Sequence, residues 1–151
     1  MIPLKNKIVF ITGASSGIGL ETAKLFAREQ AKLILAARRE ARLKMLAENL
    51  NKQFGTESFT FAFDVRGQQE VERKLNGLPS AWKKIDILIN NAGLSRGLAK
   101  IHEAELIDWE EMIDTNIKGL LYVSRLVIPW MVRRKKGHII NIGSIAGHEV
   151  Y

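Results

Sequence analysis

The chain has 151 residues, 46% of them hydrophobic, which predicts one folded domain with a substantial core and excludes a disordered chain. Its net charge is +7, which would suit an anionic partner if the basic residues formed one patch. It contains no cysteine, which excludes disulfides, thiolate metal ligands and cysteine nucleophiles and fits a reducing compartment.

Two strands and two helices are predicted near the N-terminus. Ile8–Thr12 (IVFIT) and Lys32–Ala37 (KLILAA) are continuous apolar runs, as expected for strands covered on both faces. Residues 18–29 follow the first strand with helical spacing at Ile18, Thr22, Leu25 and Phe26. Residues 40–53 follow the second strand and place one apolar stripe of a helix at Leu43, Leu46, Ala47 and Leu50.

A third strand, a short helix and a fourth strand are predicted next. Residues 58–63 alternate between polar and apolar side chains and lead to Asp64. Residues 68–75 have a helical pattern that ends at Gly77-Leu78-Pro79. Residues 85–90 (IDILIN) form another apolar run.

One long helix and a fifth strand complete the pattern. The helix is predicted over 108–134, and Pro129 should bend or interrupt it. Residues 137–143 (GHIINIG) predict the strand. The helix has apolar positions on more than one face: Trp109, Met112, Ile113, Leu120, Leu121, Val127 and Met131.

The order βαβαβαβαβ predicts a parallel sheet, because repeated right-handed crossovers place helices on both of its faces. We therefore predict one α/β domain over residues 1–151, a parallel sheet with helices on both faces.

Neither a membrane partner nor a metal site is expected. The N-terminal MIPLKNKIVFITG lacks the long apolar region and cleavage site of a signal peptide, and no apolar run approaches the ~20 residues of a membrane span. We therefore expect a cytoplasmic protein. The three histidines, His102, His138 and His148, lack the spacing of metal ligands.

The densest basic run is 133–136, but its position argues against nucleic-acid binding. It ends the long helical pattern before Gly137, where cations complement the helix dipole and glycine can serve as a C-cap. No helix-turn-helix pattern or interleaved aromatic residues accompany it. We expect no nucleic-acid partner.

The loop after the first strand is suited to binding the pyrophosphate of a dinucleotide. Its glycines permit a tight turn, a close backbone approach to phosphate and close packing of the next helix, whose N-terminus attracts anions. The lysine of a P-loop is absent. The predicted binding residues are Gly13, Ala14, Ser15, Ser16, Gly17, Ile18 and Gly19.

The end of the second strand favours NADP(H) over NAD(H). An acidic residue there would bind the ribose 2′-hydroxyl of NAD, but the chain has Arg38 and Arg39. Guanidinium groups suit phosphate oxygens, so we expect both arginines near the 2′-phosphate. The alternative is two solvated arginines before a helix.

Five features in order resemble the classical short-chain dehydrogenase/reductase family. They are the loop from Thr12 to Gly19, Asp64-Val65, Asn90-Asn91-Ala92-Gly93, Asn116 in the long helix, and Ser144 after the fifth strand. The resemblance covers the whole chain and implies a Rossmann-type doubly wound sheet with strand order 3-2-1-4-5. It also implies an NADP-dependent oxidoreductase that interconverts a hydroxyl and a carbonyl.

Three segments, DILINNAGL, DWEEMIDTNIKGL and GHIINIGSIAG, are most similar to one branch of that family. This branch contains NADP-dependent dehydrogenases of 3-hydroxy acids, including serine and L-allo-threonine. It implies a small hydroxy or keto acid as substrate. A steroid, sugar or fatty-acyl carbonyl is the alternative, because most substrate contacts lie in the C-terminal half of the family.

The resemblance also implies roles for the loops after the third and fourth strands. Asp64 would accept a hydrogen bond from the adenine amino group, and Val65 would lie against the ring. From the residues alone, Asp64 is equally a helix N-cap. Asn91 would line the cleft near the ribose, and Ala92 and Gly93 would let the chain pass close to the cofactor.

Two catalytic residues are implied in the same way. Asn116 would support a proton relay by holding a water at a local helix irregularity; alternatively, it is a buried amide bonded to neighbouring backbone. Ser144 would hydrogen-bond the reacting substrate oxygen; alternatively, it is a turn serine.

The family's general acid/base is a Tyr-x-x-x-Lys pair about a dozen residues after the serine. Tyr151 follows Ser144 by only seven residues, so we expect it to line the rim of the site without acting as the base. A tyrosine pKa of ~10 needs a nearby ammonium to suit neutral pH. We therefore expect the chain as given to bind cofactor weakly and to be inactive alone.

The surplus apolar surface of the 108–134 helix implies an oligomer. In the family, this surface meets the next helix and a neighbouring subunit, commonly in a homotetramer. We interpret the chain as the N-terminal part of a longer dehydrogenase, incomplete at its C-terminus. The alternative is a non-catalytic nucleotide-binding or regulatory protein that ends at Tyr151.

Overall fold

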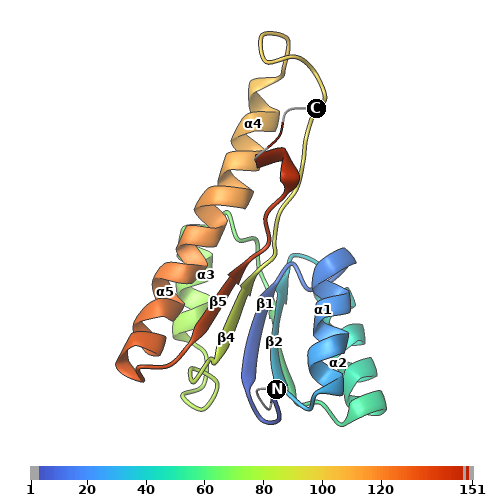
Figure 1. Cartoon of the computed structure of the whole chain (residues 1–151), viewed down its shortest axis with the longest axis vertical. Coiled ribbons are helices and arrows are strands. Elements are labelled where there is room, and N and C mark those ends of the chain that lie inside the picture. The colour runs from blue at the N-terminus through green and yellow to red at the C-terminus, as the bar shows by residue number, and fades with distance from the viewer. Residues whose placement is uncertain (1–3, 148, 150–151) are drawn as a thin grey trace.

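The computed structural model describes residues 4–147 and 149 and contains one parallel sheet of five strands (Figure 1). Its strand order, β3-β2-β1-β4-β5, confirms the predicted fold class and topology. The strands are β1 (Ile8–Thr12), β2 (Lys32–Ala37), β3 (Ser58–Ala62), β4 (Ile87–Asn90) and β5 (His138–Asn141). The predicted bounds of β1 and β2 agree with the structure, whereas β3, β4 and β5 are shorter than predicted.

Helices cover both faces of the sheet (Figure 1). Helices α1 (Gly17–Arg28) and α2 (Glu40–Phe54) pack on one face, and α3 (Gln68–Asn76) and α5 (Leu120–Arg133) pack on the other. Successive side chains of a strand point to opposite faces. Strand β1 therefore places Val9 and Ile11 in one core and Ile8 and Phe10 in the other, which explains its unbroken apolar sequence.

The predicted long helix is interrupted, but not at Pro129. It consists of α4 (Leu106–Ile113), a π-helical segment η1 (Asp114–Gly119) and α5. Helix α5 continues through Pro129, so of the predicted bend or break, the break does not occur. The π-helical segment, which contains Asn116, ends ten residues before the proline.

Helix α1 contacts the sheet through small residues. Its buried residues are Gly19, Ala23 and Ala27, whereas Ile18 and Leu25 are 63% and 59% exposed. Of the apolar positions read from the sequence, Phe26 packs against this core, whereas Ile18 and Leu25 lie off the contact face. Glycine and alanine let the helix lie close to the sheet, and a pattern of large apolar side chains does not detect such a face.

Two residues of the basic run at the end of α5 form ion pairs within the protein. Arg134 Nη1 and Lys136 Nζ lie 3.8 and 3.5 Å from Asp86 Oδ1. The left-handed residue after the helix is Lys135 (φ 51°), so the prediction of Gly137 as the C-cap was wrong. Gly137 instead permits close packing, because a Cβ atom there would overlap Met131.

Within the described part of the chain, no helix is both long enough and apolar enough to cross a bilayer. Among these same residues, no three His, Asp or Glu side chains gather closely enough to hold a metal ion.

Candidate cofactor-binding site

A cleft of about 770 Å³ opens at the carboxyl ends of the strands, where the chain order reverses between β1 and β4. Open α/β sheets bind ligands at this switch point. The cleft is lined by these predicted site residues: Gly13, Ser15, Ser16, Gly17, Ile18, Arg38, Arg39, Asp64, Val65, Asn91, Ala92, Gly93, Asn116 and Ser144.

Two predicted residues of the glycine loop lie behind this lining. Ala14 is fully buried, and its N–H donates to the Ala36 carbonyl at 3.1 Å. A Cβ atom at Gly19 would lie 2.5 Å from both the Gly13 carbonyl oxygen and Asn91 Nδ2. The absence of a side chain at Gly19 therefore permits helix α1 to pack closely under the loop.

The exposed side of the loop has the features of an anion site. Gly13 (φ 68°) and Gly17 (φ 55°) adopt left-handed conformations that disfavour a side chain, and a Cβ atom at Gly17 would meet nothing within 4 Å. Ser16 occupies the N-cap position of α1 without a side-chain cap bond. The first amides of the helix are thus available to phosphate oxygens.

Thr12 joins the glycine loop to the loop after β4. Its hydroxyl accepts bonds from the Asn91 and Ala92 amides at 3.1 Å each, and Asn91 Nδ2 donates to the Thr12 carbonyl at 2.9 Å. Asn91 therefore lines the cleft while its side chain ties the two loops together. The sequence analysis assigned Thr12 no role of its own, although a polar residue ending an apolar strand was the available signal.

The two arginines after β2 adopt different positions. Arg39 Nη2 donates to Ser15 Oγ at 3.0 Å and to Ser16 Oγ at 2.7 Å, which joins the end of β2 to the glycine loop. Arg38 points toward Asp64, with 4.0 Å between Nη1 and Oδ2. Each serine hydroxyl that accepts from Arg39 keeps its own hydrogen for a further acceptor.

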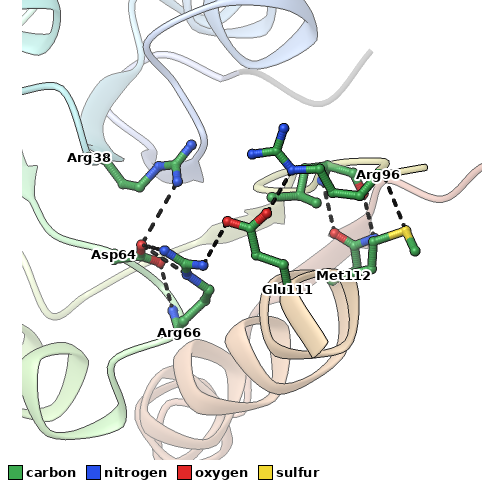
Figure 2. Close-up of polar contacts among 8 residues, drawn as sticks. Arg38, Asp64, Arg66, Arg96, Glu111 and Met112 are labelled. Carbon is green, nitrogen blue, oxygen red and sulfur yellow. Dashed lines mark hydrogen bonds and ion pairs between the residues drawn. The ribbon is translucent and has the colours of Figure 1, made fainter. Parts of the chain in front are cut away.

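Asp64 is held by Arg66 (Figure 2). The Arg66 amide donates to Oδ1 at 3.0 Å, and the guanidinium donates to Oδ2 at 3.0 Å from Nε and 2.8 Å from Nη2. Partial burial alone would raise the pKa of Asp64, but the bonds and charge of Arg66 together outweigh it and lower that pKa. The N-cap of α3 is Gly67, so the N-cap interpretation of Asp64 was wrong.

Replacing Arg66 with methionine should destabilise the protein at pH 7 and should cost less stability near pH 3. Because the pKa of Asp64 is lowered in the folded state, the unfolded state binds more protons as the pH falls. The stabilisation is thus present above pH ~4 and is lost as the pH falls through the folded value. We expect a cost of about 1 kcal/mol at pH 7, because the pair is partly exposed.

Urea unfolding at the two pH values measures this difference. Arg73→Met is a suitable control, because Arg73 makes a more exposed pair with Glu70 at 3.8 Å. An equal cost of Arg66→Met at both pH values would contradict the assignment of the ion pair.

The π-helical segment places Asn116 against the loop after β4. Asn116 Nδ2 donates to the Leu94 carbonyl at 2.8 Å, and its Oδ1 accepts from the Leu94 amide at 2.9 Å. Asn116 is exposed, so the alternative of a buried amide was wrong, although its bonds to backbone are present. Gly119 lies against Val65, where a Cβ atom would be 2.6 Å from Val65 Cγ2.

Ser144 also lines the cleft, between β5 and the short 3-10 helix η2 (Ile145–Gly147). Its Oγ accepts from the Ala146 amide at 3.2 Å, so it is a turn serine that also faces the cleft. Tyr151, predicted to line the rim, lies outside the described residues.

A partly buried amide cluster lies at this edge of the sheet and was not predicted. Asn90 Nδ2 donates to Ser124 Oγ and to Asn141 Oδ1, each at 2.9 Å. The cluster joins β4, α5 and β5. Asn90 and Asn141 both end apolar strands, which was the signal available in the sequence.

The doubly wound sheet and the glycine loop at the end of its first strand define an α/β protein of the Rossmann type. Residues 7–151 match the family model described as short chain dehydrogenase. The chain belongs to the short chain dehydrogenase family, which confirms the resemblance seen in its motifs.

Several relatives share close similarity over nearly the whole chain. An NADP-dependent 3-hydroxy acid dehydrogenase, YdfG, of Salmonella typhi is 46% identical over 95% of this chain and 56% of the relative. A serine 3-dehydrogenase of Rhizobium radiobacter is 42% identical over 95% of this chain and 55% of its own. The chain thus spans about half the length of the curated relatives that it matches.

Solved structures of similar proteins have the same fold as this chain. Serine dehydrogenase from Escherichia coli superposes with a TM-score of 0.89 at 46% identity, covering 95% of this chain and 65% of that one. A closed form of serine dehydrogenase complexed with NADP+ superposes with a TM-score of 0.87 at 45% identity, covering 95% of this chain and 56% of that one.

Proposed function

We propose that this protein binds NADP(H) in the cleft and acts as an oxidoreductase that interconverts a hydroxyl and a carbonyl on a small 3-hydroxy acid such as serine. The observation that carries the proposal is the pair Arg38 and Arg39 beside the glycine loop, where an NAD site would have an acid. The names of the similar proteins support both the cofactor and the substrate class.

The residues present fit this cofactor. We assign the pyrophosphate to the exposed amides of the glycine loop and the first turn of α1, and the 2′-phosphate to Arg38 and Arg39. Asp64 is held ionised, as an acceptor for the adenine amino group requires, and Val65 lies beside it.

We assign the reacting end of the cleft to Ser144 and Asn116, both of which line it. When bound, the nicotinamide supplies the hydride chemistry. Ser144 Oγ accepts from Ala146, so its hydrogen can be donated to the substrate oxygen. Asn116 lies in a π-helical turn, a feature frequent at functional sites, and we assign it the support of a proton relay.

We further propose that turnover requires the Tyr-x-x-x-Lys pair of the family and that residues 1–151 alone bind nucleotide without turnover. We also propose a homo-oligomer in the cytoplasm. Its interface would use the exposed apolar side chains of α4, η1 and α5, which are Leu106, Ile107, Ile113, Ile117, Leu121, Ile128 and Val132.

Substrate oxidation by the native gene product tests the proposal. With NADP+, we expect reduced cofactor to form with serine and other 3-hydroxy acids faster than with alcohols that lack a carboxylate. Residues 1–151 expressed alone should bind NADPH but give no turnover. Failure of the gene product to bind NADPH would overturn the proposal, and a preference for sugars would redirect it to the other carbonyl class.

A further inference from the structure

One carboxylate joins two parts of the cleft that are distant in sequence. Glu111, on α4, accepts from Arg66 Nη1 through Oε1 at 2.9 Å and from Arg96 Nε through Oε2 at 2.6 Å. Arg66 also holds Asp64, the proposed adenine partner, whereas Arg96 belongs to the loop after β4. One oxygen of Glu111 thus binds Arg66, and the other binds Arg96.

The loop around Arg96 is a wall of the cleft. Gly93, Leu94 and Ser95 line it directly, and Leu94 is paired with Asn116 through both of its backbone groups. Two residues further on, the Arg96 amide lies 3.4 Å from Met112 Sδ. The Arg96–Glu111 pair is therefore a second point at which this loop, residues 94–97, is fixed to the α4–η1 helix.

The charges along this path alternate. Figure 2 shows them in sequence from the end of β2 to the loop after β4: Arg38, Asp64, Arg66, Glu111 and Arg96. Glu111 is the least exposed of the last three, with 24% of its side chain accessible against 33% for Arg66 and 50% for Arg96. An isolated surface pair contributes little, but a partly buried carboxylate shared by two guanidiniums restrains both of them.

We propose that Glu111 is a positioning residue that transmits occupation of the adenine end of the cleft to the 94–97 loop. The inference rests on the proposed function, because it takes Asp64 as the adenine partner. A ligand amino group on Asp64 restrains that carboxylate and, through it, the Arg66 guanidinium. Arg66 then holds Glu111 in place, so that ordering Arg96 and its loop costs less conformational entropy.

Hydrogen–deuterium exchange of the 94–97 amides tests the inference, with 2′,5′-ADP as the probe because it occupies the adenine end alone. In wild type, 2′,5′-ADP should slow this exchange about threefold, the size expected for partly exposed ion pairs. In Glu111→Gln, exchange should be about threefold faster without nucleotide and should no longer respond to it. By linkage, the affinity of Glu111→Gln for 2′,5′-ADP should be lower than that of wild type by the factor, about threefold, by which the nucleotide slows loop exchange in wild type.

Glu110→Gln is the matched control, because it removes the same charge from the adjacent, exposed residue; it should behave as wild type. Arg96→Met provides a second variant, which cuts the path at the loop and leaves Arg66 bound to both carboxylates. It should also abolish the response of the loop to nucleotide.

The outcomes separate the two proposals. The role of Glu111 is refuted if 2′,5′-ADP binds and slows exchange of the 94–97 amides equally in wild type and Glu111→Gln. It is also refuted if neither variant changes this exchange. In both cases the proposed function stands. If 2′,5′-ADP does not bind to wild type at millimolar concentration, the proposed function is refuted, and the transmission with it.

Discussion

Replacing Gly19 with alanine is expected to weaken NADPH binding by about 100-fold and to lower the free energy of unfolding by about 1–3 kcal/mol. The added Cβ atom would lie 2.5 Å from both the Gly13 carbonyl oxygen and Asn91 Nδ2, so the glycine loop has to move away from helix α1. The gain in helix propensity, about 1 kcal/mol, is smaller than the expected strain. Displacing the loop misaligns the amides proposed to bind the pyrophosphate, where each bond to a charged group contributes about 1.5–3 kcal/mol.

Fluorescence titration with NADPH and urea unfolding measure the two effects. Gly67→Ala is the matched control, since a Cβ atom there would make only ordinary contacts, the closest at 3.6 Å. Retention of wild-type affinity by Gly19→Ala would show that the loop either tolerates the side chain or does not bind the cofactor.

Reversing the charge of Arg38 with glutamate is expected to raise the Kd for NADPH by about 100-fold and that for NADH by less than about threefold. An arginine–phosphate pair contributes about 1.5–3 kcal/mol, and a carboxylate in its place repels the 2′-phosphate. Arg38 suits this test better than Arg39, whose guanidinium also holds Ser15 and Ser16 and thereby the loop used by both cofactors.

Lys52→Glu makes the same change in net charge at the opposite end of helix α2 and should leave both affinities unaltered. Parallel titrations with NADPH and NADH at one ionic strength provide the comparison. Equal losses for the two cofactors in Arg38→Glu would refute the assignment of the 2′-phosphate to this residue.

The strands at the centre of the sheet were predictable because burial on both faces requires a continuous run of apolar residues. Strand β1 has only apolar residues before Thr12, and the structure buries all of them. Apolar spacing predicted the contact face of α1 only in part. Phe26 packs against the core, but Ala23 and Ala27 contribute little hydrophobicity yet allow the closest approach. The π-helical segment was expected only through the family resemblance, which implied a local helix irregularity at Asn116.

The backbone features of the site were predicted better than its ion pairs. Gly13 and Gly17 signal left-handed turns by their identity alone. Arg66 and Glu111 are separated by 45 positions, and each has the sequence appearance of an ordinary surface charge. Only the crossing of α4 over the loops after β3 and β4 brings them together, and that depends on the packing of the whole chain.

The alternation of β1 between the two cores has a consequence for cooperativity. A single five-residue strand contributes side chains to both hydrophobic layers, so a displacement of this strand disturbs the packing of both. The two halves of the nucleotide cleft, built on opposite sides of this strand, are therefore joined in one thermodynamic unit. A substitution that disturbs the packing under α1 should therefore also loosen the packing under α5.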